Sequence, residues 1–204
     1  MPVSAYIFDI GGVLLDFDLR GIARTLAGTS ALRTNKLLAL RDDASLREVE
    51  TGRMNGFAYH RDVVKPIVPE STYRGLVCAW RDVFTINRAG YSLFTDLHKA
   101  GRSVYVLSNL SDYTLEAIQE KFPDLLKHSE GNFFSYLIGA VKPEPAAYLK
   151  VCETTVTKPE ECIFLDDTAE CVEGAKHVGM QGMLFSRDCI KEIRLACGAR
   201  SGGK

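Results

Sequence analysis

The stretch that decides the fold is YIFDIGGVLLDFD, residues 6–18. Its first three residues, YIF, are aromatic or β-branched, which predicts the end of a buried β-strand. Asp9 follows at the tip of that strand, and Gly11 and Gly12 come soon after it. A carboxylate at a strand tip beside glycines is typical of a catalytic or metal-binding group. A second carboxylate two residues further on would complete an acidic pair, but Gly11 occupies that position.

Short apolar runs with the character of strands buried on both faces recur along the chain. Four are clear and a fifth is weaker: residues 5–10, 103–109, 161–167 and 181–185, and then 134–142. Helical segments lie among them, at residues 91–100, 114–122, 145–153 and 169–178. Alternating strands and helices indicate βαβ units. We therefore predict an α/β fold, a Rossmann-like parallel sheet with helices on both faces.

Residues 16–88 interrupt this alternation. They contain segments with helical spacing of apolar residues and no convincing strand. We predict that residues 1–15 and 89–200 form the core domain and that residues 16–88 form an inserted helical cap subdomain. The polar, glycine-rich end suggests a disordered tail at residues 201–204.

Composition narrows the class of protein. The 204 residues carry a net charge of −1, which argues against a nucleic-acid partner. No apolar run is long enough to span a membrane, and the N-terminus lacks the pattern of a signal peptide. The six cysteines form no Cys-x-x-Cys pair, so we expect reduced thiols. We expect a cytoplasmic protein, a monomer or a homodimer, with no membrane partner.

Polar residues follow several of the predicted strands. In an open parallel sheet, ligands bind beyond the carboxyl ends of the strands. The candidates at those ends are Asp9, Ser108, Asn109, Lys142, Asp166 and Asp167. A nucleophilic carboxylate, a hydroxyl, an ammonium and an acidic pair are the groups that phosphoryl transfer requires, with Mg²⁺ held among the carboxylates.

Four segments in order resemble the motifs of the haloacid dehalogenase superfamily, a large group made mostly of phosphatases. They are YIFDIGGVLLD from residue 6, VLSN from 106, VKPEPAAY from 141 and FLDDTAECVEGAKHVGM from 164. The helical insertion after the first motif is similar to the small cap type of that superfamily. Within it, ETGRMNGFAY and AWRDVF resemble the branch that holds bacterial sugar-phosphate phosphatases and the phosphatase domain of soluble epoxide hydrolase.

The resemblance implies a role for each strand-end residue. Asp9 would be the nucleophile and a metal ligand, and Gly11 would offer its backbone carbonyl to Mg²⁺. Asp167 would bind the metal directly, and Asp166 would orient it or a bound water.

The resemblance also implies a phosphate site. Ser108 and Lys142 would bind the phosphate and Asn109 would help shape that pocket. The implied activity is hydrolysis of a small phosphorylated metabolite, with a sugar phosphate as one candidate. The cap would then select the substrate.

The glycine at position 11 is the main departure from the superfamily's pattern. Most of its phosphatases have aspartate there, to protonate the leaving oxygen and then activate water. A positioned acid or base typically contributes about 10²- to 10⁴-fold to the rate. Three interpretations follow. The chain is a phosphatase whose substrate has an easy leaving group or which uses a substitute acid, with Asp16 and Asp18 as candidates. Otherwise it is a slow enzyme that accumulates phospho-Asp9, or a non-catalytic protein that binds phosphorylated ligands.

Two other functions fit the sequence less well. A phosphorelay receiver also places Asp, Ser or Thr and Lys around Mg²⁺, but its acidic pair follows the first strand, whereas the pair here is at residues 166–167. Dehalogenation would need a different first motif and an aromatic pocket that the sequence does not show.

Overall fold

The computed structural model describes residues 3–197, and its centre is a five-stranded parallel sheet. The strands are β1 (Ala5–Phe8), β4 (Val104–Ser108), β5 (Gly131–Phe134), β6 (Cys162–Asp166) and β7 (Gln181–Leu184). Their order in the sheet is β5-β4-β1-β6-β7. In the register of β1, Tyr6 pairs with Val104 on one side and Ile163 on the other. The central strand is therefore buried on both faces, as its apolar run predicts.

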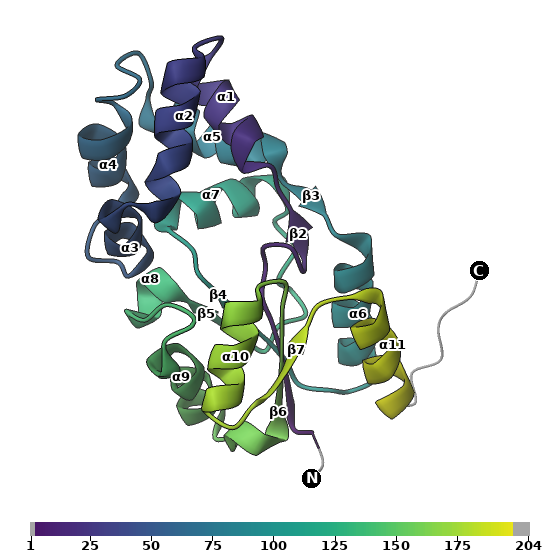
Figure 1. Cartoon of the computed structure of the whole chain (residues 1–204). Helices are drawn as coiled ribbons and strands as arrows, with labels where there is room; N and C mark the ends of the chain where they lie inside the picture. Colours follow the sequence, from purple (N-terminus) through teal and green to yellow (C-terminus); the bar gives the residue numbers. More distant parts are fainter. Residues whose placement is uncertain (1–2, 198–204) are drawn as a thin grey trace.

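Helices cover both faces of this sheet, which confirms the predicted α/β class. Figure 1 shows α6 and α11 on one side and α9 and α10 on the other. The core helices are α6 (Arg88–Lys99), α7 (Asp112–Lys121), α8 (Ser135–Ile138), α9 (Pro145–Thr155), α10 (Ala169–His177) and α11 (Arg187–Ala196), with a 3₁₀ turn, η3, at Pro159–Glu161. Proline opens α9, where its missing N–H costs no hydrogen bond.

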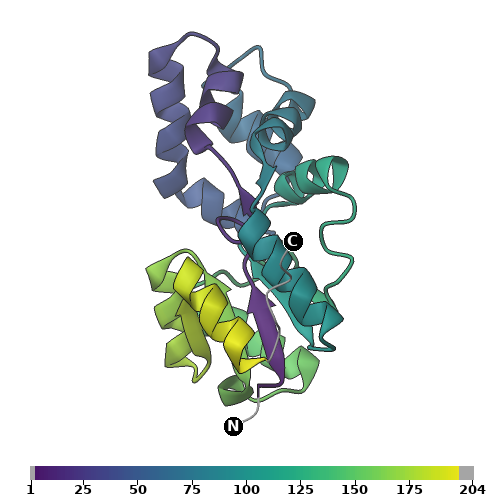
Figure 2. The same ribbon diagram turned by 90° about the vertical axis from the view of Figure 1, so that its right-hand side faces the viewer.

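The chain leaves the core after β1 and returns before α6 through a short antiparallel ribbon, β2 (Leu15–Asp16) and β3 (Thr85–Ile86). Between them lie α1 (Leu19–Ala27), α2 (Ala31–Ala39), η1 (Leu40–Asp42), α3 (Ala44–Glu50), α4 (Gly56–Tyr59), η2 (His60–Val64) and α5 (Tyr73–Val83). We refer to residues 16–88 as the cap. Figures 1 and 2 show its helices gathered at one end of the sheet.

Two predicted elements differ from the structure. The weak strand predicted at 134–142 is wrong, because β5 ends at Phe134 and the chain turns into α8. The Ser135 hydroxyl bonds both the N–H and the carbonyl of Leu110, at 3.0 and 3.1 Å, and Gly139 ends α8 in the left-handed conformation. The structure also contains a strand that the sequence pattern does not predict, β3, whose two residues are too few to form a recognisable pattern.

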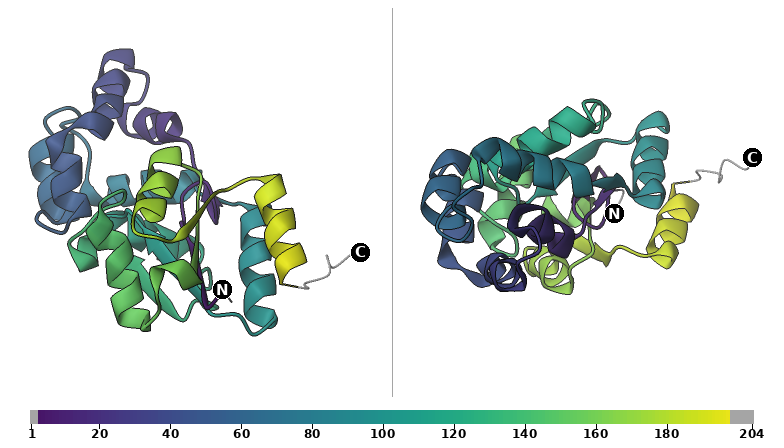
Figure 3. Two further views of the ribbon diagram at one scale, coloured as in Figure 1. Left: turned by 60° about the horizontal axis from the view of Figure 1, so that its bottom comes forward. Right: turned by 90° about the horizontal axis from the view of Figure 1, so that it is seen from above.

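Several polar contacts fasten the cap to the core. The Arg47 guanidinium forms an ion pair with Glu144, and the Gly56 N–H donates to Asp112 Oδ2 at 3.0 Å. At Gly52, a Cβ atom would stand 2.2 Å from the carbonyl oxygen of Tyr136, so the two backbones touch. Seen from above, the cap helices overlie part of the core, while α6 and α11 lie to one side (Figure 3). The C-terminal end of α3 is therefore held directly against the core.

Among the helices of residues 3–197, none combines the length and the apolar character that crossing a bilayer would require. The predicted tail at 201–204 lies outside the described residues.

Candidate active site

Three adjacent strands have polar residues at their carboxyl ends, on one edge of the sheet. Asp9 follows β1, Ser108 ends β4 and Asp166 ends β6. Because β1 lies between β4 and β6 and all three run parallel, these side chains meet at the carboxyl edge. All three are buried, and Asp166 is 1% exposed. Burial of two carboxylates so close together requires a positive partner.

Lys142 is that partner. It comes from the segment between α8 and α9, and its Nζ lies 2.9 Å from Asp9 Oδ1 and 2.5 Å from Asp166 Oδ2. Burial lowers the pKa of Lys142, but the charges of Asp9 and Asp166 outweigh this and raise it above the ordinary value. Burial raises the pKa of Asp9 to about 6, although Lys142 opposes the shift. Lys142 is thus a permanent cation beside the candidate nucleophile.

Asn109 holds the backbone at Lys142. Its side-chain Nδ2 donates to the Lys142 carbonyl at 2.9 Å, and its Oδ1 accepts from the Lys142 N–H at 2.8 Å. Both ends of the amide are therefore occupied by one neighbouring residue. This geometry favours Asn109 as a residue that positions Lys142 at the rim of the predicted phosphate pocket.

The residues present fit a hard divalent cation. Oxygen atoms from Asp9, Asp166 and Asp167 lie within 4.8 Å of one another. Asp9 Oδ1 is buried and accepts no well-aligned hydrogen bond, even with Lys142 Nζ nearby. Three carboxylates and one ammonium leave a net charge of −2 in the cluster, which Mg²⁺ would neutralise. Gly11 lines the same space, as its predicted role requires.

Asp166 and Asp167 differ in how firmly each is held. Asp166 Oδ1 accepts from the Thr168 N–H at 2.8 Å while its other oxygen faces Lys142. Asp167 is exposed and accepts from the Thr168 hydroxyl at 3.3 Å. Asp167 therefore has the more available carboxylate for a metal, and Asp166 the more constrained one.

Gly12 makes room for Asp167, and this gives a first testable prediction. Its φ is +68°, and a Cβ at this position would stand 2.0 Å from Asp167 Oδ2. Gly12→Ala should displace that carboxylate and weaken Mg²⁺ binding at least about tenfold, measured by isothermal titration. The matched control is Gly101→Ala, because Gly101 has a φ of +71° and nothing within 4 Å of its Cβ. Equal metal affinity in the two variants would refute a role for Asp167 in holding the metal.

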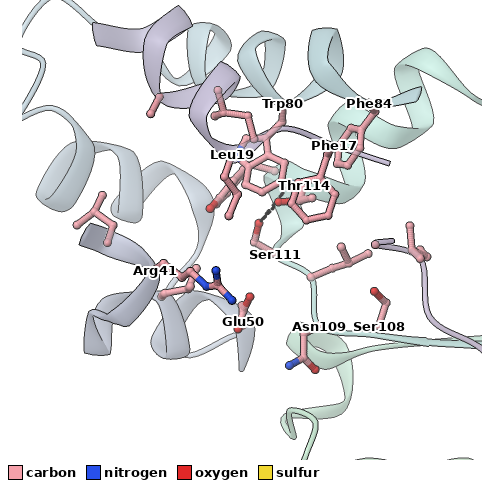
Figure 4. Close-up of a pocket in the computed structure, with 18 of the residues that line it drawn as sticks. Phe17, Leu19, Arg41, Glu50, Trp80, Phe84, Ser108, Asn109, Ser111 and Thr114 are labelled. Atoms are coloured by element: carbon pink, nitrogen blue, oxygen red, sulfur yellow. Dashed lines mark hydrogen bonds between the residues drawn. The ribbon is translucent and has the colours of Figure 1, made fainter. Parts of the chain in front are cut away.

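A cavity of about 520 Å³ lies between this cluster and the cap. Asp9, Ser108, Lys142 and Asp167 line its core side. Figure 4 shows Ser108 and Asn109 on that side and the rings of Phe17, Trp80 and Phe84 across from them. The volume falls in the range of typical small-molecule sites.

Phe17 lies against position 11, so a side chain there would have to displace its ring slightly. A Cβ on Gly11 would stand 3.0 Å from Phe17 Cε1, although the backbone there has no left-handed strain. The Phe17 ring itself packs against Trp80 and Phe84, with centroids 5.9 and 6.0 Å away. An aspartate at position 11 would therefore have to share the base of the cap with the Phe17 ring.

Sequence reasoning missed Glu50, the last residue of α3. Within residues 3–197, four carboxylic acids line the cavity: Asp9, Asp166, Asp167 and Glu50. Glu50 is half-buried, and burial raises its pKa to about 7, while Lys142 and Arg47 lower it and Asp9 raises it further. Figure 4 shows its carboxyl group among the residues that line the cavity. It is the one acid of this set that the cap supplies.

The two acids considered as substitutes lie elsewhere. Asp16 is exposed on β2 and accepts from Asn87 Nδ2 at 2.9 Å. Asp18 is the N-cap of α1 and accepts from the Arg20 N–H at 2.9 Å. Neither lines the cavity. No local pattern marks Glu50, because its position depends on how the cap folds back on the core.

Comparison with known proteins shows what the chain is similar to. Bifunctional epoxide hydrolase 2 of Rattus norvegicus is 30% identical over 113 residues, which cover 54% of this chain and 20% of that protein. Sesquiterpene phosphatase astK of Aspergillus oryzae is 28% identical over 183 residues, 88% of each chain. For the epoxide hydrolases and a mycobacterial phosphatase, the match spans about a quarter or less of the relative's length.

A solved structure and a family model complete the comparison. The HAD family enzyme bt-2542 of Bacteroides thetaiotaomicron, in complex with magnesium and inorganic phosphate, superposes with a TM-score of 0.78 at 22% identity, covering 90% of this chain and 94% of that one. The model of the haloacid dehalogenase-like hydrolases matches residues 3–179. With that match over most of its length, the chain belongs to the haloacid dehalogenase-like hydrolase family.

Proposed function

We propose that the protein is a Mg²⁺-dependent phosphatase that hydrolyses a phosphate monoester through an aspartyl phosphate on Asp9. The observation that carries the proposal is the buried cluster in which Asp9 faces Lys142 at 2.9 Å, with Asp166 and Asp167 beside it. The phosphatase relative from Aspergillus oryzae and the magnesium- and phosphate-bound neighbour support the same reaction class.

In the first step, a carboxylate oxygen of Asp9 attacks phosphorus and the bond from phosphorus to the ester oxygen breaks. Lys142 and Ser108 hold the phosphoryl oxygens, and the ammonium offsets charge that develops on them. A bound Mg²⁺, held by Asp9, Asp167 and the Gly11 carbonyl with Asp166 in support, would supply further neutralisation of the phosphoryl charge. Glu50, in its acid form, gives its proton to the leaving oxygen.

In the second step, water attacks phosphorus and the bond to Asp9 breaks. Glu50, now ionised, accepts the proton from that water, so both the acid and the carboxylate of Asp9 are regenerated. Arg47 of α3 and Gly52 just after it contact the core, which holds Glu50 over the strand ends where this water would react. Glu50 thus performs the two proton transfers that an aspartate at position 11 would otherwise perform.

A second function remains supported by one observation. Gly11 under the Phe17 ring would suit a protein that binds phosphate esters without hydrolysing them. The test is phosphate release from p-nitrophenyl phosphate and a panel of alkyl and sugar monophosphates, with Mg²⁺ and with EDTA. Metal-dependent release supports the phosphatase. Binding of phosphate esters without release on any of them would favour the binder.

The substitution Gly11→Asp tests whether Glu50 supplies the proton that an aspartate at position 11 would supply. We expect no gain in kcat/KM, because Glu50 already supplies the proton and the Phe17 ring lies against position 11. In a Glu50→Gln and Phe17→Ala background, the same change should recover about tenfold or more of the lost rate. The double variant without Gly11→Asp is the control. A gain of that size in the single variant would contradict the assignment of Glu50.

A further inference from the structure

The cap side of the cavity is apolar. Among the cap residues of the described chain that line it, Arg41 and Glu50 are charged, and all others are aliphatic or aromatic. On the core side, the Ser111 and Thr114 hydroxyls bond each other at 2.7 Å, which uses hydrogen-bonding capacity that a polar ligand would need. Four of the charged groups lie at the strand ends, and apart from Arg41 and Glu50 the cap wall is made of aliphatic and aromatic side chains.

The helix α2 contributes half-buried leucines to the wall of this cavity. Its one fully buried residue is Thr34, whereas Leu37 and Leu38 are half-buried and line the cavity. Leu40, directly after α2, lies in the same wall and is also half-buried. Leu37 and Leu40 also pack against the core, whereas Leu38 does not, so part of this leucine surface borders the cavity and a ligand there could cover it.

We propose that this cavity holds the carbon chain of an alkyl or isoprenyl monophosphate, with the phosphate on Asp9 and Lys142 and the chain extending between the cap helices. The proposal rests on the proposed phosphatase function and names its substrate class. Continuity supports it, since one cavity of about 520 Å³ reaches from Asp9 and Lys142 to Leu38 and Leu26.

A sugar phosphate fits this surface poorly. Each sugar hydroxyl that leaves water needs a hydrogen-bond partner, or its burial is unfavourable. Arg41 and Glu50 are the charged groups that the cap offers, and Glu50 is used by the leaving oxygen in the proposed reaction. An apolar chain makes no such demand and covers the leucines instead. The sugar phosphate considered from the sequence is therefore the less favoured substrate.

The test is a series of linear alkyl monophosphates from ethyl to decyl, each below its micelle concentration, together with glucose 1-phosphate. We expect KM to fall about fourfold per added methylene until the cavity is filled. Geranyl monophosphate should then be turned over with a higher kcat/KM than glucose 1-phosphate. A KM that is independent of chain length, in an enzyme that releases phosphate, would overturn this proposal and leave the phosphatase standing.

Two variants of α2 locate the chain. Leu38→Asn places an amide in the cavity wall and should raise the KM for decyl phosphate at least about tenfold more than for ethyl phosphate. Leu32→Asn is the matched control, because Leu32 is on the same helix, is 68% exposed and does not line the cavity. Equal effects of the two variants on the chain-length dependence would count against the cavity as the chain's site.

If no substrate is hydrolysed, binding measurements still test whether the cavity holds the carbon chain. Decyl phosphate and ethyl phosphate titrated into the Asp9→Asn variant report chain recognition without turnover. Tighter binding of decyl phosphate that Leu38→Asn removes would support the chain site while the phosphatase fails. Equal binding of the two esters would refute the chain site by itself.

Discussion

Replacing Asp9 with asparagine should lower kcat at least about 10³-fold. The amide retains the shape of the side chain but provides no anionic oxygen to attack phosphorus. The change also removes a charge that burial disfavours, as the raised pKa of Asp9 shows. Lys142 keeps Asp166 as its partner at 2.5 Å, so the fold and the melting temperature should be preserved.

Three measurements check this expectation: kcat on p-nitrophenyl phosphate, the melting temperature, and acid-quenched mass spectrometry for phosphate bound covalently to the wild-type chain. The matched control is Asp16→Asn, an exposed aspartate hydrogen-bonded to Asn87 outside the cavity. It should retain the wild-type rate. Substantial turnover by Asp9→Asn, or a covalent phosphate on another residue, would show that Asp9 is not the nucleophile.

The sheet could be predicted because its signals are local. The strand β1 is apolar, and β4 and β6 are apolar up to their last residue, which is what strands covered on both faces require. The run at 134–142 has the same local character, yet Leu137 is 64% exposed and belongs to a single helical turn. That turn is set by the contact of Ser135 with Leu110, 25 residues away along the chain. Composition alone does not report such a contact.

The residues of the candidate site likewise fall into those that local sequence predicts and those that it does not. Asp9, Ser108 and Asp166 follow strands, so the rule for parallel sheets predicts that they meet, and the structure brings them together. Glu50 and Phe17 belong to the cap, and their places depend on the angle at which the cap docks on the core. The sequence therefore indicates the phosphate end of the site, while the proton source and the apolar wall required the folded chain.

Glu50→Gln should lower kcat about 10²- to 10⁴-fold on an alkyl monophosphate, because the alkoxide leaves as a strong base and needs a proton. In kcat/KM, which reports the step in which the leaving group departs, the effect on p-nitrophenyl phosphate should be much smaller than the effect on the alkyl ester, since nitrophenolate leaves without protonation. This dependence on the leaving group distinguishes an acid from a residue that merely supports the fold. Glutamine preserves the size of the side chain and its place at the end of α3.

Glu48→Gln is the matched control on the same helix. Glu48 pairs with Arg53 at 2.8 Å, at a position that does not line the cavity. An exposed ion pair of this kind contributes little to stability, so the control should fold and react as the wild type does. If both variants lost the same activity on both substrates, the assignment of Glu50 as the acid would be wrong.

The pH profile gives an independent measure of the same group. Burial raises the pKa of Glu50 to about 7, with Lys142, Arg47 and Asp9 as the charged groups acting on it. The acid form is present below that pH, so kcat/KM for alkyl phosphates, which reports the step that needs the acid, should fall as pH rises through about 7. In Glu50→Gln this decline should disappear, because glutamine does not titrate. A decline that persists in the variant would assign the proton to another group, and Gly11 would then have no replacement in the cap.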